Sequence, residues 1–238
     1  MQKLVVLILV CIAHPALAWD GPGMWYRAAD DANPGGGGIL GTGGGHDHGI
    51  KCTDCHVERK SEPNLAFGMT FSPQLAGSAY VPGTRYTITA RLTGAQLPGT
   101  CGVPNGKNID GFAASFEDDS GASTGKLAGD DGQSAPSCTL PSPPPPGTTA
   151  LDGDCKVIFS SSAPNLTQWT FSWTAPASGD VHVFWGAVDG DCDMMSMHDA
   201  AVTGSMTLTP VAMALPGDVP WVIQLAAAVY EVARYRAK

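Results

Sequence analysis

Seven short segments of the chain alternate apolar and polar residues with period two, and this pattern constrains the fold more than any other feature. The segments are rich in β-branched and aromatic residues, and Gly, Pro and Asp separate them. Because successive side chains of a strand point to opposite faces, each segment predicts a strand with one buried face. The sequence therefore predicts a mainly β, immunoglobulin-like antiparallel sandwich of about seven strands in two sheets. The predicted strands are 66–71, 84–93, 111–116, 156–160, 167–175, 180–188 and 203–209.

One long segment inside this pattern does not resemble a strand. Residues 118–154 are polar, and residues 141–147 read PSPPPPG. Proline lacks the backbone N–H that a strand needs and favours an extended, solvated conformation. We expect a surface insertion here, within a sandwich that spans residues 66–210.

The first 18 residues have the features of a secretory signal peptide. Lys3 stands in a short polar start, residues 4–13 form an apolar run, and residues 16–18 (ALA) match a cleavage pattern. The run is shorter than the ~20 residues that span a bilayer, although an uncleaved anchor is an alternative. We expect an exported protein that begins at Trp19 and resides in the periplasm or on the outer cell surface.

A glycine-rich stretch follows the signal peptide. Residues 33–45 read NPGGGGILGTGGG, and glycine loses more backbone entropy on ordering than any other residue. The pattern predicts a flexible leader over residues 19–45. A polar segment, residues 46–65, then precedes the first strand and adopts a loop or a single helical turn.

The C-terminal residues 211–238 depart from the strand pattern. Trp221, Leu225, Val229 and Val232 recur at helical spacing, which predicts an amphipathic helix. Its apolar stretch is short for a bilayer span, so we expect no integral membrane span. A basic cluster at the very end leaves peripheral or tail anchoring as an alternative.

The charge of the chain limits its partners. The formal net charge is −9, and it becomes −10 once Lys3 leaves with the signal peptide. The remaining basic residues are scattered except at the C-terminus. A surface of this kind repels nucleic acid and anionic membranes, so neither is expected as a partner.

The chemistry of the chain is concentrated in Cys52-Thr53-Asp54-Cys55-His56, which fits the c-type haem attachment pattern C-x-x-C-H. Two thiols at this spacing reach the two vinyl groups on one porphyrin edge, and the histidine becomes the proximal iron ligand. We expect one covalent haem c on Cys52, Cys55 and His56. The alternatives are a zinc site completed by His46 or His48, or a disulfide or redox pair of the two cysteines.

The sixth iron ligand is left open by the sequence. His46 and His48 lie within a loop's reach of the motif, and His198 forms a second candidate site. Near His198 stand the methionines Met194, Met195 and Met197. A methionine would raise the reduction potential, a histidine would keep it low, and an open position would admit small molecules.

Four cysteines remain after Cys11 leaves and the haem motif takes two. An oxidising compartment drives them into two disulfides. If the strands alternate in direction, the loops holding Cys101 and Cys192 share one end of the sandwich, and those holding Cys138 and Cys155 share the other. Because bonded cysteines need Cα atoms within about 7 Å, we expect the pairs Cys101–Cys192 and Cys138–Cys155, and we expect His198 at the haem end.

Several motifs together resemble the Reeler-like, choice-of-anchor V domains of bacterial surface proteins. After the C-x-x-C-H motif come YVPGTRYTITARLTG (80–94), DGFAASFED (110–118) and WTFSWTAPASGDVHVFWGAVDGD (169–191), so the resemblance covers about residues 51–210. It implies a β-sandwich and a surface location, and any haem role carries over only to Cys52, Cys55 and His56. The proline-rich insertion, the four extra cysteines and a tail without a clear anchor depart from the family.

These observations favour an exported monohaem c-type cytochrome domain that transfers electrons with a redox partner protein of the envelope. No catalytic set of serine, cysteine or carboxylate residues is apparent, so we expect a carrier rather than an enzyme. One alternative is a structural or adhesive surface sandwich in which C-x-x-C-H is vestigial or disulfide-bonded. A further alternative is a haem-based sensor or enzyme with an open sixth position.

Overall fold

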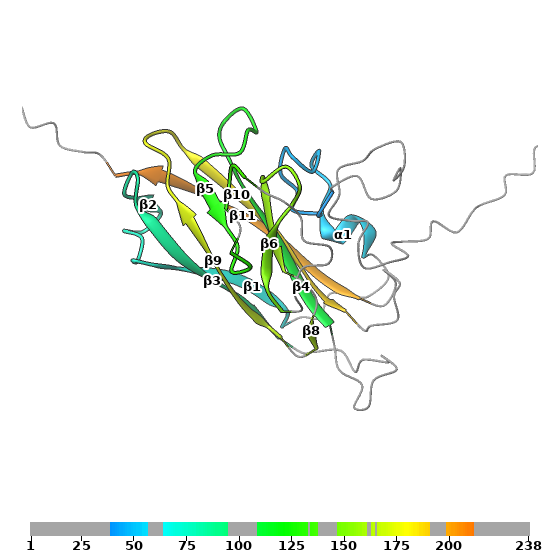
Figure 1. The fold of residues 1–238 in the computed structure, drawn as a ribbon. Coiled ribbons are helices and arrows are strands. Elements are labelled where there is room, and N and C mark those ends of the chain that lie inside the picture. Colours follow the sequence, from blue (N-terminus) through cyan, green and yellow to red (C-terminus); the bar gives the residue numbers. More distant parts are fainter. Residues whose placement is uncertain are drawn as a thin grey trace, which may run out of the picture.

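A computed structural model describes residues 39–56, 64–94, 109–132, 134–137, 147–160, 163–164, 166–190 and 199–211 (Figure 1). The predicted signal peptide, the leader up to residue 38 and the predicted C-terminal helix lie outside these ranges. So do Cys101, Cys138, Cys192, His198 and the three methionines beside His198.

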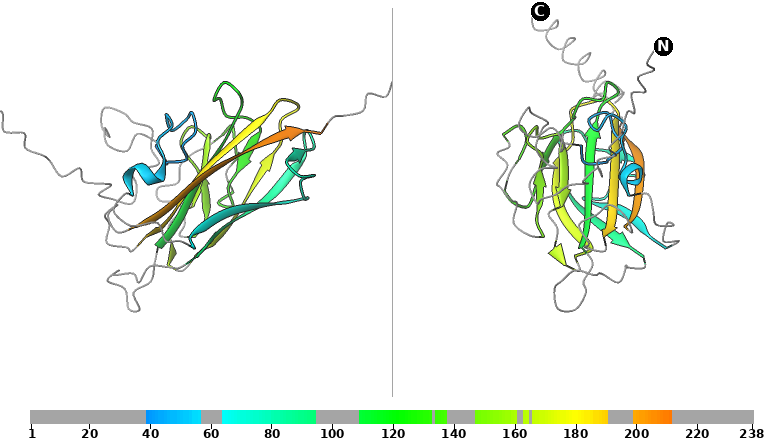
Figure 2. Two further views of the ribbon diagram at one scale, coloured as in Figure 1. Left: turned by 180° about the vertical axis from the view of Figure 1, so that it is seen from behind. Right: turned by 90° about the vertical axis from the view of Figure 1, so that its right-hand side faces the viewer.

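The predicted two-sheet sandwich is confirmed (Figures 1 and 2). One sheet has the strand order β1-β3-β9-β5, and the other has β2-β11-β10-β4-β7-β6 with β8 paired to β4. All pairs are antiparallel except β2 with β11, which is parallel and was not expected. The seven predicted strands appear as β1 (Ala66–Ser72), β3 (Arg85–Thr93), β4 (Ile109–Glu117), β7 (Val157–Ser160), β9 (Gln168–Thr174), β10 (Val181–Gly190) and β11 (Ala200–Pro210). Four short strands join them: β2 (Ala79–Tyr80), β5 (Lys126–Ala128), β6 (Thr149–Leu151) and β8 (Ala163–Pro164).

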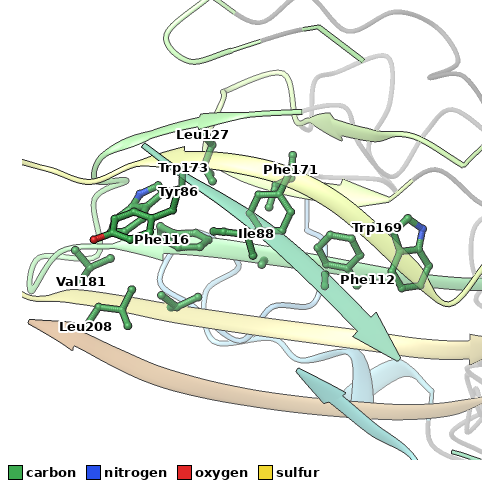
Figure 3. Close-up of a cluster of buried hydrophobic side chains, with 14 of the residues drawn as sticks. Tyr86, Ile88, Phe112, Phe116, Leu127, Trp169, Phe171, Trp173, Val181 and Leu208 are labelled. Atoms are coloured by element: carbon green, nitrogen blue, oxygen red, sulfur yellow. The ribbon is translucent and has the colours of Figure 1, made fainter. Parts of the chain in front are cut away.

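Aromatic side chains from both sheets fill the space between them (Figure 3). Along β3 the side chains alternate between exposed and buried, so that Tyr86 and Ile88 point inward. The Trp173 ring lies 5.9 Å from the Tyr86 ring and 5.1 Å from the Phe116 ring, centroid to centroid. Burying one such side chain contributes roughly 1.5–3 kcal/mol, so the alternating pattern is the main source of the fold's stability.

The segment 118–154 is more than a surface insertion. It supplies β5, which pairs with β9, and β6, which pairs with β7. Leu127 and Leu151 are buried in the core between the sheets. The expectation was wrong for these two strands because each has only three residues, too few for a period-two pattern to stand out against polar neighbours.

The expected flexible leader ends earlier than predicted. Residues 39–51, called the strap below, lie on the outer face of the larger sheet and are drawn in blue beside α1 (Cys52–Cys55) in Figure 1. Leu40 packs there in a cluster with Ala113, Ala150, Val157 and Phe159. Buried apolar area and hydrogen bonds from the strap offset the entropy that its glycines lose on ordering.

Within the described part of the chain, no helix has the length and apolar character needed to cross a membrane.

Candidate functional site

The C-x-x-C-H motif forms one helical turn, α1, at the end of the strap. The Asp54 carboxylate accepts a 2.9 Å hydrogen bond from the Lys51 backbone N–H and so caps the turn. The His56 N–H donates to the Cys52 carbonyl at 2.9 Å. Residues four apart lie on the same face of a helical turn, so Cys52 and His56 both face the sheet. Figure 2 shows α1 lying against β10 and β11.

A buried carboxylate holds the His56 ring. Its Nδ1 lies 2.8 Å from Oδ2 of Asp199, whose side chain is only 7% exposed. Asp199 directly precedes β11, where Ala200 pairs with Asp189 of β10. Because Nδ1 is engaged, Nε2 is the ring nitrogen left to coordinate a metal. A carboxylate on the far nitrogen is the usual support of a metal-binding histidine.

The Cys52 thiol occupies a slot between two glycines. A Cβ added at Gly186 would collide with Cys52 Sγ, and one added at Gly41 would lie 3.0 Å from it. Burial, followed by the charge of Asp47, raises the pKa of the Cys52 thiol to about 12. Redox-active C-x-x-C pairs use a thiol with a lowered pKa, so this environment disfavours that alternative.

The two motif cysteines are not bonded to each other. Cys52 and Cys55 are both free thiols, and Cys55 is exposed. The expected alternative of a disulfide within the motif is therefore not formed in this structure.

One carboxylate, Asp47, orders the strap internally, and a second, Glu117, holds it on the sheet. Asp47 accepts hydrogen bonds from the Leu40 N–H at 3.0 Å, the Thr42 N–H at 2.6 Å and the Thr42 hydroxyl. Glu117, the last residue of β4, accepts the Gly45 N–H at 2.7 Å. Both carboxylates are buried. Neither Asp47 nor Glu117 carried a sequence signal, because most of their partners are backbone N–H groups, which any residue supplies.

His46 is paired elsewhere than at the motif. Its Nε2 lies 3.2 Å from Oδ2 of Asp152, which follows β6. The hydrogen bond to Asp152 raises the pKa of His46, although burial acts in the opposite direction. His48, two residues on, is exposed on a turn with a φ of 54°.

The strap therefore places both histidines away from His56. The His46 N–H lies 3.4 Å from Glu117, whose strand partner is His182. Asp199, by contrast, adjoins the Asp189 end of the same sheet. Seven residues of strand separate the two ends, about 23 Å at ~3.3 Å per residue. In this structure neither His46 nor His48 lies beside His56, while His198 and the methionines lie outside the described residues, so the sixth ligand stays a prediction.

The ligands of the alternative zinc site are not brought together in the described part of the chain. Among the residues that the structure describes, no three His, Cys, Asp or Glu side chains gather as a metal site. A structural zinc ion takes four ligands. The zinc alternative, Cys52, Cys55 and His56 completed by His46 or His48, is not assembled among these residues, and His46 is paired with Asp152.

The strand ends are consistent with the reasoning behind the disulfide predictions. β3 ends and β4 begins at the same end of the sandwich as the β10–β11 connection, because Ile109 pairs with Gly190 and because Thr93 and Asp189 line one cavity. Cys155 is disulfide-bonded, and its partner lies outside the described residues because Cys52 and Cys55 are free. The pairs Cys101–Cys192 and Cys138–Cys155 remain predictions.

A second buried acidic feature went unnoticed in the sequence. Asp110 of β4 and Asp189 of β10 are direct cross-strand partners, and both are fully buried. Burial, together with the hydrogen bond and charge of Asp189, raises the pKa of Asp110 to about 8. Asp189 also lines a cavity of about 240 Å³ with Leu65, Leu92 and Thr167. Only the strand register brings the two acids together, since they are far apart in sequence.

Comparison with known proteins yields distant structural similarities. No protein-family model matches the chain, and no curated protein matches it. The human F-spondin reeler domain is 15% identical with a TM-score of 0.37, covering 64% of this chain and 94% of that one. A conjugative transposon lipoprotein from Bacteroides eggerthii is 12% identical with a TM-score of 0.28, covering 59% and 95%. AggA, the major subunit of aggregative adherence fimbriae type I from Escherichia coli, is 13% identical with a TM-score of 0.29, covering 66% and 99%.

Structural similarities with TM-scores this low support no conclusion about the function of this chain. The sandwich itself rests on the strand pairing described above.

Proposed function

We propose that this protein is an exported β-sandwich domain that carries one covalent haem c at α1 and transfers electrons to a partner protein of the envelope. The observation that carries the proposal is the contact between His56 Nδ1 and Asp199. The histidine of a C-x-x-C-H motif is thereby oriented by a buried carboxylate, as metal-binding histidines are.

The donor set, as the structure places it, fits a c-type haem only in part. Cys55 is exposed and His56 keeps Nε2 available, as thioether formation and iron ligation require. Cys52 Sγ, however, lies in the slot beside Gly41 and Gly186. Its side chain must leave this slot to reach a vinyl group. When bound, the haem would supply one-electron iron chemistry.

Four residues of the chain would hold and orient the haem. Cys52 and Cys55 would hold the group, His56 would ligate the iron, and Asp199 would fix the plane of the imidazole. The paired strands β10 and β11 give Asp199 a rigid base. The predicted export adds support, because c-type haem is attached after secretion.

The proposal is tested in protein purified from a host with a cytochrome maturation system. Wild type should retain haem stain in a denaturing gel and give a c-type pyridine haemochrome spectrum. Cys55→Ala should strongly lower covalent haem and leave the sandwich folded, because α1 precedes the first strand. Thr53→Ala, in the same turn, is the matched control and should keep its haem. A colourless wild type, or full haem stain in Cys55→Ala, would refute the proposal.

A second candidate function rests on the buried Cys52 thiol. In a structural or adhesive surface domain, Cys52 would act as an apolar anchor that seats the strap against Gly186. This candidate predicts a colourless protein in which Cys52→Ala lowers the melting temperature more than Cys55→Ala does. The covalent haem measurement separates the two functions.

A further inference from the structure

β1 ends the smaller sheet and lacks the features that usually keep an edge strand from pairing with another chain. Among the described residues β1 pairs only with β3, one residue for one residue and without a bulge. The strand contains no charged residue and no proline. Natural sheets protect their edges with charged residues, proline, bulges or very short strands, and a long uncharged edge accepts a further strand. The other strands that end a sheet, β2, β5 and β6, have three residues at most.

The inward side chains of β1 are apolar and only partly covered. Phe67, Met69 and Phe71 alternate with exposed residues and pack against the core while remaining half-buried. The Phe67 ring lies 5.4 Å from the Phe112 ring, and the Phe71 ring lies 6.1 Å from the Tyr86 ring, centroid to centroid. A strand laid along β1 would bury the rest of this apolar surface if its own inward side chains were apolar.

The sequence of β1 is complementary to itself when reversed. With two copies antiparallel and Met69 opposite Met69 of a second copy, Phe67 lies opposite Phe71 and Phe71 opposite Phe67. Aromatic cross-strand pairs of this kind stabilise a sheet. On the outward face Gly68 lies opposite Thr70, and space is open there, since a Cβ added at Gly68 meets no atom within 4 Å. An arrangement with a two-fold axis also closes after two chains.

Charge favours the same contact. The chain carries a formal net charge of −9, so two copies repel each other over most of their surfaces. β1 adds no charge to a contact between copies. An edge without charged residues is therefore a place where two acidic molecules can meet.

We propose that β1 is a homodimer interface, at which two copies of this chain pair antiparallel about Met69 and join their smaller sheets into one continuous sheet. The inference goes beyond the proposed function and does not depend on haem, because α1 packs against strands of the larger sheet.

Sedimentation velocity of the purified protein over a wide range of concentrations tests the proposal. Wild type should change reversibly from monomer to dimer as the concentration rises. Met69→Lys places two like charges directly opposite each other on the two-fold axis and should weaken the dimer by about tenfold or more. Thr87→Lys adds the same charge to an exposed position of the central strand β3. This control should dimerise as wild type does.

A charge exchange at Thr70 tests the register. Thr70 is exposed, so its replacement leaves the core intact. In the proposed register the two copies of residue 70 are diagonal neighbours, about 7–8 Å apart. Thr70→Lys and Thr70→Asp should each weaken the dimer when studied alone. An equimolar mixture of the two variants should restore it, because unlike charges then face each other.

A wild type that is monomeric at every concentration would overturn the proposal. So would a dimer that the lysine variants at Met69 and Thr70 leave unchanged, because it would use another surface. A dimer that is covalent in a non-reducing gel would come from a disulfide and would be equally contradictory. If Met69→Lys does not fold, the mixture of the two Thr70 variants decides, and failure of that mixture to dimerise better than either variant alone would exclude the register.

Discussion

At the scale of single residues, Gly186 sets how closely α1 approaches the sheet. Any side chain at this position of β10 would meet Cys52 Sγ and the Gly41 carbonyl. Gly41 itself has a φ of +73° and a tight contact with the Cys52 backbone, which only glycine tolerates without strain. The chain therefore uses two glycines, distant in sequence, to seat one cysteine.

We predict that Gly186→Ala lowers the free energy of unfolding by about 1–3 kcal/mol, the usual cost of overpacking. Chemical denaturation measures the change. Gly68→Ala is the matched control, because a Cβ at that strand position meets no atom within 4 Å. Both variants are measured without haem, and equal stability of the two would contradict the close seating of Cys52.

His46 should make the strap sensitive to pH. Its pKa in the folded protein is raised above 6.5 by the hydrogen bond to Asp152. Its contribution to stability is thus fully present below about pH 6.5 and is lost as pH rises through the folded value. We expect the stability difference between wild type and His46→Gln to shrink from pH 5 to pH 9. His48→Gln controls for loss of an imidazole from the strap, and a pH-independent difference for His46→Gln would disprove the account.

At the scale of elements, the pairing of β4 with β10 opposes two acids in the core. Asp110 and Asp189 share the inner face of the sheet, where one proton between them avoids two buried like charges. The raised pKa of Asp110, about 8 against an ordinary 3.8, means that the folded state binds protons more tightly than the unfolded state. Stability is then greatest below pH 3.8 as far as this pair is concerned, and it declines as pH rises to about 8.

We predict that Asp110→Asn removes most of this decline, because an amide keeps the hydrogen bond without a charge. Urea unfolding at pH 5 and pH 9 should show a smaller loss of stability in the variant than in wild type. The same loss in both proteins would mean that the pair does not share a proton.

The strands show what a sequence pattern reveals and what it conceals. Alternation predicted β3 almost to the residue because Arg85 to Thr93 gives nine residues of uninterrupted signal. β5 and β6 were not predicted, because each has only three residues and is flanked by polar sequence. The strap was mistaken for a flexible leader because its order comes from Asp47 and Glu117, which bind backbone N–H groups and leave no periodic trace.

In the candidate site, too, some residues could be predicted from the sequence and others could not. Cys52, Cys55 and His56 were predicted as a haem site from local spacing alone, and this assignment stays a prediction. Asp199 was not identified, because its contact with His56 spans 143 residues and depends on the strand register. The placement of His46 failed for a related reason, since proximity in sequence suggested a ligand whereas the strap carries His46 to Asp152.

At the scale of the whole molecule, the sandwich has two different outer faces. The strap and α1 cover part of the larger sheet (Figure 2). The outer face of the smaller sheet carries exposed polar side chains such as Arg85 and Gln168. The proposed site lies on the covered face, at the end near the β10–β11 connection. A partner that exchanges electrons with α1 would approach from this end.

The central claim is that α1 carries a covalent haem, and the intact mass of the denatured wild-type protein tests it most directly. Protein secreted by a host competent in cytochrome maturation should gain the mass of one haem, with the adduct on the peptide that contains Cys52 and Cys55. The mass of the bare polypeptide, with two free thiols on that peptide, would contradict the account.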